Sequence, residues 1–200
     1  MKVSLNFKFK GNRKYIQGPD IIDAVIPYIK EKYSGNVTEF KYSAHQMLYS
    51  NADLVFGSAP EKELNSLILF KWNENKLIYA SVIENNLPVT ESYEYDENPV
   101  QQNAVVEGKD ITLLEGDMLY ERYSFSELIV SMNKFYMEQK ITNQGKWVIT
   151  KIEYNSLKQI EQWKGRPVRI TLLKNLNNNL TKSAIYMDSE PTGFIYFSLL

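Results

Sequence analysis

The sequence predicts an α+β fold in which a β-α-β-β-β(-β) unit occurs twice in tandem, each with a long helix packed in or on a curved antiparallel sheet. Two observations predict it. The phrase "LFKWNENKL" at 69–77 returns as "LLKNLNNNL" at 172–180, 103 positions later, and a helical pattern in 19–29 has a counterpart 107 positions later in 126–136. Matches in the same order at nearly constant spacing indicate an internal repeat. Two copies in one chain predict a pseudo-dimer.

The first unit, expected at 1–97, opens with the alternating run "VSLNFKF", which is typical of a strand. A helix is expected near 20–32, where Pro19 suits the first turn and Asp20 suits the positive end of the helix dipole. Alternating and apolar runs follow, separated by Asn-rich turns that favour hairpins. Residues 98–107 form the expected linker, since the polar segment "DENPVQQNA" contains a proline and has no periodicity.

The second unit, expected at 108–200, repeats this order. Its helix is expected near 125–138, where Ser124 and Glu127 have the spacing of a capping box. Four strand-like runs follow this helix. The helix residues expected to be buried in the two units are Ile22, Val25, Ile29, Leu128, Met132 and Phe135.

Composition restricts the function. The 200 residues carry a formal net charge of −1, which gives no electrostatic reason to expect nucleic acid as a partner. The chain has no cysteine and a single histidine, so a metal site is not expected. No run approaches the ~18 apolar residues that a membrane span requires. A cytoplasmic protein is therefore expected.

A long, largely apolar helix followed by an antiparallel meander resembles the hot-dog fold, in which a sheet wraps around a central helix. Two such units resemble a double hot-dog protein. The resemblance covers the whole chain and depends on topology and helix character, not on a diagnostic motif. A cystatin-like unit, with its helix across an open curved sheet, is the alternative, and the polar residues Ser131, Asn133 and Lys134 of the second helix suit it.

The resemblance implies binding or processing of an acyl thioester, carried by coenzyme A or an acyl-carrier protein. It implies no separate cofactor, because the coenzyme A or phosphopantetheine moiety is part of the substrate. Whether the chain is an enzyme stays open. The alternatives are a thioesterase-like hydrolase, a dehydratase-like lyase, and a non-catalytic module that binds a ligand or a protein. A homo-oligomer is also compatible with the resemblance.

Three residues are candidates for catalysis. Hot-dog thioesterases and dehydratases commonly use an acid on or near the central helix, and Asp20 and Glu127 are the acids in the first helical turns. Acids at this position also stabilise helices of every function. Hot-dog dehydratases pair such an acid with a histidine, for which His45 is the candidate, but the Pro and Gly neighbours of that family motif are absent here.

Basic residues near Gly11 are the candidates for ligand binding. Lys10, Arg13 and Lys14 lie together in "FKGNRKY" and could hold the phosphates of coenzyme A or of a carrier-protein arm. The spacing is not that of a phosphate loop. A solvated charged turn is the alternative interpretation.

Overall fold

The computed structural model describes residues 1–57, 64–73, 76–113, 119–141 and 145–200. The chain divides into two compact units, Met1–Tyr95 and Asp96–Leu200. Residues 98–107, expected as a linker, instead form a helix and a strand of the second unit. Pro99 occupies the first turn of this helix, where its missing N–H costs no hydrogen bond, so the proline begins an element here.

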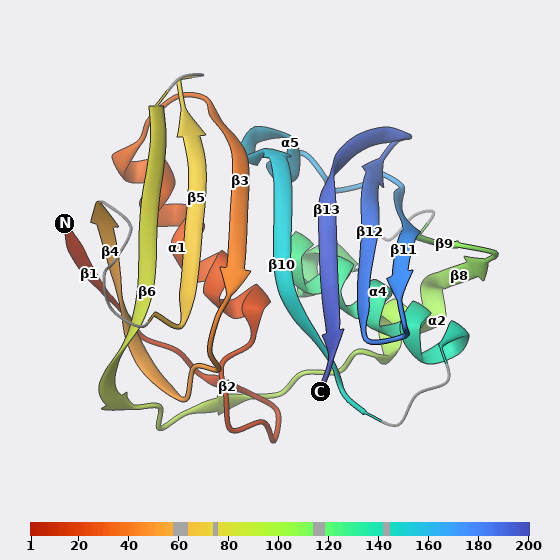
Figure 1. The fold of residues 1–200 in the computed structure, drawn as a ribbon, viewed down its shortest axis with the longest axis horizontal. Helices are drawn as coiled ribbons and strands as arrows, with labels where there is room; N and C mark the ends of the chain where they lie inside the picture. Colours follow the sequence, from red (N-terminus) through yellow and green to blue (C-terminus); the bar gives the residue numbers. More distant parts are fainter. Residues whose placement is uncertain (58–63, 74–75, 114–118, 142–144) are drawn as a thin grey trace. The chain divides into compact units, whose positions relative to one another are not determined.

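Unit 1 contains one long helix and an antiparallel sheet (Figure 1). The strands of this sheet follow the order β1-β4-β6-β5-β3. The short strands β2 and β7 form a separate, parallel pair. The elements are β1 (Lys2–Leu5), β2 (Phe9–Lys10), α1 (Gly18–Lys32), β3 (Val37–Ala44), β4 (Ser50–Gly57), β5 (Ser66–Trp72), β6 (Lys76–Pro88) and β7 (Ser92–Tyr93).

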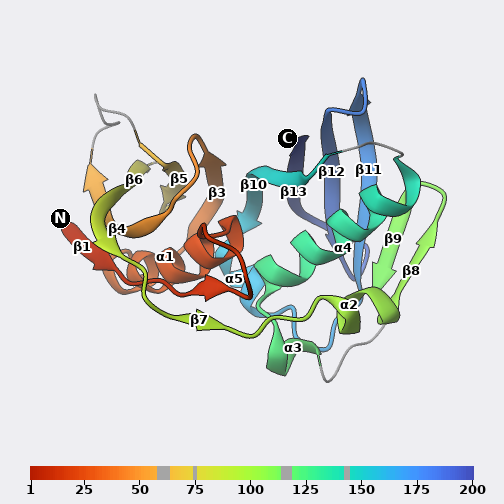
Figure 2. The ribbon, with the colours of Figure 1, turned by 90° about the horizontal axis from the view of Figure 1, so that it is seen from below.

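Unit 2 has the same kind of architecture with more short helices. Its strands follow the order β8-β9-β11-β12-β13-β10, and α4 lies along one face of this sheet (Figure 2). The elements are α2 (Asn98–Asn103), β8 (Ala104–Glu107), β9 (Asp110–Leu113), α3 (Leu119–Arg122), α4 (Phe125–Lys140), β10 (Trp147–Ser156), α5 (Leu157–Glu161), β11 (Val168–Leu176), β12 (Leu180–Met187) and β13 (Glu190–Leu199).

The two repeated phrases both form hairpins, but at different places in the strand order. The first forms the β5–β6 hairpin and the second the β11–β12 hairpin, each with Asn in the left-handed region that such turns need. The first phrase therefore joins strands in the order β4-β6-β5-β3, in which β6 lies between β4 and β5. The second joins strands in the order β9-β11-β12-β13, in which β11, β12 and β13 lie side by side in chain order. Both phrases have the composition typical of a hairpin turn, and the tandem duplication stays a prediction.

Each long helix buries its apolar face. Of the six helix residues expected in the core, five have at most 1% of their surface exposed and Phe135 is half-buried. The next two residues, Tyr136 and Met137, take the buried positions on this turn of α4. The five buried residues are Ile22, Val25, Ile29, Leu128 and Met132.

Gly193 of β13 allows two strands of unit 2 to approach closely. A Cβ atom at this position would lie 1.9 Å from the carbonyl oxygen of Glu153 on the neighbouring β10. Only glycine fits such a contact. No described helix in either unit is long and apolar enough to cross a bilayer.

Candidate functional site

Asp20 lies in the first turn of α1, where both of its carboxylate oxygens accept hydrogen bonds. The backbone N–H of Gln17, which precedes the helix, donates to Oδ2 at 3.3 Å. The hydroxyl of Tyr93 donates to Oδ1 at 2.9 Å, and Lys10 Nζ lies 3.2 Å from the same oxygen. The Asp20 side chain is 13% exposed. These contacts occupy most of the lone pairs that a carboxylate offers.

Lys10 is buried beside Asp20 and is 1% exposed. Its ammonium lies 4.1 Å from the ring centroid of Tyr95 and 5.8 Å from that of Tyr93, which are cation–π distances. The charge is therefore stabilised by one carboxylate and two aromatic rings, which offsets its removal from water.

The pairing of β2 with β7 brings these residues together. Phe9 and Gly11 donate backbone hydrogen bonds to the carbonyls of Glu91 and Tyr93, at 2.9 and 2.8 Å. This places Lys10 opposite Tyr93 in the strand register. Since residues two apart in an extended segment point the same way, Tyr95 can join Tyr93 against the Lys10 side chain. The cluster formed by Lys10, Asp20, Tyr93 and Tyr95 thus joins the start of α1 to the first and last segments of unit 1.

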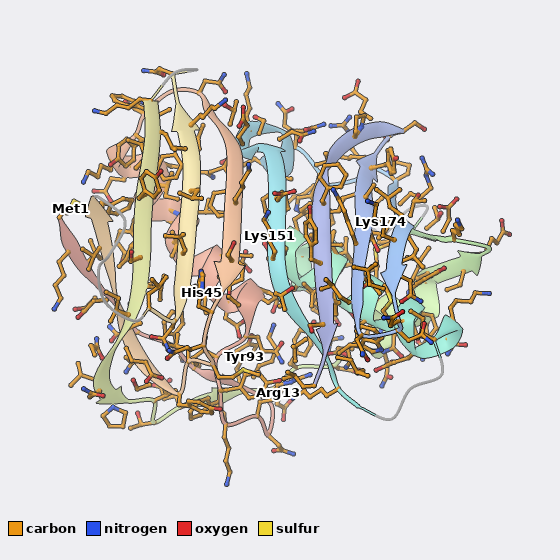
Figure 3. All side chains as sticks on the ribbon, in the orientation of Figure 1. Met1, Arg13, His45, Tyr93, Lys151 and Lys174 are labelled. Atoms are coloured by element: carbon orange, nitrogen blue, oxygen red, sulfur yellow. The ribbon has the colours of Figure 1, made fainter. Side chains whose placement is uncertain are left out.

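The other basic candidates remain nearer the surface. The Arg13 guanidinium lies 5.9 Å from the centroid of the Tyr95 ring, on the margin of the cluster, and Lys14 is exposed. Arg13 and Tyr93 are both labelled in Figure 3. Of the three basic residues expected to bind phosphate, Lys10 is therefore engaged with Asp20. Arg13 and Lys14 are the two with surface to offer a ligand.

Glu127 occupies the corresponding place in the first turn of α4. Its Oε2 accepts the backbone N–H of Ser124 at 3.0 Å, and Ser124 Oγ accepts the backbone N–H of Glu127 at the same distance. This is the capping box that the sequence predicts. The hydroxyls of Ser126 and Tyr154 are 3.1 Å apart in the buried layer beneath this helix start.

His45 follows β3 and is exposed. Its backbone N–H donates to the carbonyl of Asn65 at 2.9 Å. Within the described part of unit 1, no contact joins the His45 ring to Asp20. Within unit 1 the structure therefore brings together Asp20, Lys10 and, at the margin, Arg13, and it does not bring His45 to Asp20.

Three tyrosines near Asp20 were not among the site residues predicted from the sequence. Tyr93 and Tyr95 alternate in "ESYEY", a pattern that gave no sign of contact with Lys10, more than 80 positions earlier. Tyr42 is fully buried, and burial raises its pKa to about 12, with the Asp20 charge adding to the rise and a hydrogen bond from Ser66 opposing it. Only tertiary structure reveals these neighbours.

No protein-family model matches the chain, and no curated protein matches it in sequence. Solved structures do match. A candidate thioesterase II from Thermobifida fusca is similar over all of this chain and 91% of its own, with 7% identity and a TM-score of 0.54. The dehydratase domain of PpsC from Mycobacterium tuberculosis, in complex with C12:1-CoA, is similar over 100% and 92% of the chains, with 7% identity and a TM-score of 0.51.

A third similar structure has a hot-dog fold. It is a conserved protein of unknown function with a hot-dog fold from Alicyclobacillus acidocaldarius, similar over 100% and 92% of the chains, with 6% identity and a TM-score of 0.50. The predicted hot-dog fold is thus confirmed in preference to the cystatin-like alternative. Sequence identities this low are informative about the fold alone. This chain is therefore a protein of the hot-dog fold.

Proposed function

We propose that this chain binds acyl thioesters, carried by coenzyme A or an acyl-carrier protein, without turning them over at Asp20, Glu127 or His45. The fold supports the ligand class, since its structural neighbours include a candidate thioesterase and a dehydratase domain in complex with an acyl-CoA. One observation supports binding without catalysis: the Asp20 carboxylate is held by Lys10, by the Tyr93 hydroxyl and by the backbone N–H of Gln17.

A general base needs a lone pair directed at the proton that it removes. Three donors already occupy the two oxygens of Asp20, and an ammonium that is 1% exposed stabilises its negative charge. These contacts leave little of the Asp20 carboxylate available to accept a proton from a substrate. The carboxylate of Glu127 is used in helix capping, and His45 is exposed.

Binding and turnover can be measured separately. A thioether analogue of acyl-CoA cannot be hydrolysed, so titration calorimetry with analogues of short and long acyl chains measures binding alone. Release of coenzyme A from the matching thioesters is followed with a thiol reagent. Because the chain has no cysteine, the protein itself adds no signal. We expect binding, and no turnover above the uncatalysed rate.

Arg13 and Lys14 provide the test of the ligand site, because both keep some exposed surface. Arg13→Ala and Lys14→Ala should each weaken binding of the coenzyme A analogue and leave binding of an acyl-pantetheine analogue, which lacks the nucleotide phosphates, unchanged. Lys109→Ala, at an exposed turn of unit 2, is the control. No binding of any acyl analogue would refute the proposed ligand. Turnover that Asp20→Asn abolishes, in a variant that circular dichroism shows to be folded, would refute the absence of catalysis and support a hydrolase. Dehydration of a 3-hydroxyacyl thioester would support a lyase.

A further inference from the structure

The outer face of the unit 2 sheet, opposite α4, carries a row of three lysines and one tyrosine. In the strand register Lys174 of β11 lies opposite Lys182 of β12, Lys182 lies opposite Tyr196 of β13, and Tyr196 lies opposite Lys151 of β10. Directly paired residues point to the same face of a sheet, so the four side chains project together. Lys174 and Lys151 mark the two ends of the row in Figure 3.

Aromatic rings lie between these cations. The Lys182 ammonium is 4.0 Å from the ring centroid of Phe194 and 5.3 Å from that of Tyr196, while Lys151 is 5.1 Å from the Tyr196 centroid. On the same face, the Arg169 guanidinium is 4.2 Å from the centroid of Tyr186. Rings and positive charges therefore lie side by side on this face over four adjacent strands.

The positive charge in this row is only partly compensated. Glu153 is 2.6 Å from Lys151 and accepts the hydroxyl of Tyr196 at 2.9 Å. Across the described ranges of the chain, no carboxylate forms an ion pair with Lys174 or Lys182. Like charges directly opposite in a sheet are destabilising, so this pair lowers the stability of the free protein. An anionic partner would remove that cost.

We propose that this face of unit 2 binds single-stranded nucleic acid, with phosphates on Lys174, Lys182 and Lys151 and bases stacked on Phe194 and Tyr196. Single strands are bound by cationic surfaces that carry aromatic stacking platforms, and sheet faces with aromatics on central strands serve this purpose. At about 4.8 Å between strands, the row spans about 14 Å, enough for a few nucleotides. On binding, the ammonium groups of Lys182 and Lys151 would move from the aromatic rings to phosphates, and bases would take their places on the rings.

The formal net charge of −1 is compatible with this proposal. Net charge is a sum over the whole chain, whereas mobile ions screen charges over about 8–10 Å. A ligand at this face therefore experiences the nearby cations more strongly than distant acidic residues. The net charge describes the average over the whole chain, whereas the strand register gathers positive charges on this one face.

The test is fluorescence anisotropy with a labelled oligothymidylate of about 12 nucleotides, within the usual site size, at several salt concentrations. Three phosphate contacts predict a slope of log K against log salt of about −2, and Lys174→Ala or Lys182→Ala should each make it shallower by about 0.7. Tyr196→Leu should weaken binding about tenfold with little change in slope. Lys164→Ala, an exposed lysine away from the row, is the control and should leave binding unchanged.

Circular dichroism of each variant confirms that it is folded. Absence of binding at low salt would overturn the proposal, as would binding that both lysine variants retain with an unchanged slope. A dimer that Lys182→Glu dissociates, with no affinity for the oligonucleotide, would make this face an interface between copies of the chain instead. Attachment to anionic phospholipid vesicles without affinity for the oligonucleotide would likewise overturn it.

Discussion

Removing either partner of the ion pair between Lys10 and Asp20 should destabilise unit 1, because the remaining charge would stay buried. Their charged atoms are 3.2 Å apart, and the side chains are 1% and 13% exposed. Removing one partner of a buried pair typically costs about 3–5 kcal/mol, because the other charge stays buried without compensation. Asp20→Asn leaves the ammonium of Lys10 in this position, so we expect a loss of about 3–4 kcal/mol.

Lys10→Met should cost less than Asp20→Asn. The Asp20 carboxylate keeps the donors from Tyr93 and Gln17 and retains some contact with water, so we expect a loss of about 1–2 kcal/mol. In the double variant neither charge remains buried. Its loss should therefore be smaller than the two single losses together, with a coupling free energy of at least about 1.5 kcal/mol.

Urea denaturation followed by far-UV circular dichroism measures the free energy of unfolding for each variant. Glu127→Gln is the matched control, because it removes the charge at the same helix position in unit 2 and should cost about 0.3–1 kcal/mol. If Asp20→Asn costs no more than this control and adds independently to Lys10→Met, the two side chains do not form the ion pair and Asp20 acts as a helix-terminal charge.

Three further predictions concern the core and the alkaline limit of stability. Ile29→Ala should lower the free energy of unfolding by about 2–5 kcal/mol in urea, since the side chain is fully buried, and a loss of a few tenths would show a peripheral helix. Gly193→Ala should prevent unit 2 from folding normally, because its Cβ would lie 1.9 Å from a backbone oxygen, and a wild-type melting temperature would contradict this. Burial raises the pKa of Tyr42 to about 12, so its neutral hydroxyl contributes stability that is present below about pH 10 and is lost as the pH rises toward 12. Between pH 10 and 12 the free energy of unfolding of the Tyr42→Phe variant should therefore fall by about 2 kcal/mol less than that of the wild type, as measured by urea denaturation. The same fall in both proteins would contradict the raised pKa of Tyr42.

Two predictions that depended on local sequence were confirmed. Periodicity located both long helices, and the spacing of Ser124 and Glu127 predicted a capping box that the structure contains. The wide apolar face of the first helix favoured the hot-dog fold over the cystatin-like alternative. These features depend on residues within a few positions of one another, which is the range over which helix geometry fixes neighbours.

Other features depended on contacts between distant segments. Lys10 appeared to be one of three exposed bases, but the pairing of β2 with β7 buries it against Asp20. The polar segment at 98–107 became α2 and β8 because its strand pairs with β9. Hairpin sequences were recognisable, but their places in the strand order were not, because a turn motif determines only which two strands it joins.

The amino-acid sequence by itself thus determined the helices, the hairpin turns and the apolar faces that lead to the hot-dog fold. Tertiary structure alone decided that the Asp20 carboxylate meets a buried ammonium, and that Lys174, Lys182 and Lys151 share one sheet face. The buried ion pair and the row of lysines were decided by tertiary structure for the same physical reason. The energy of a charge depends on its exposure to water and on the charges within a few ångströms, and strand pairing determines both.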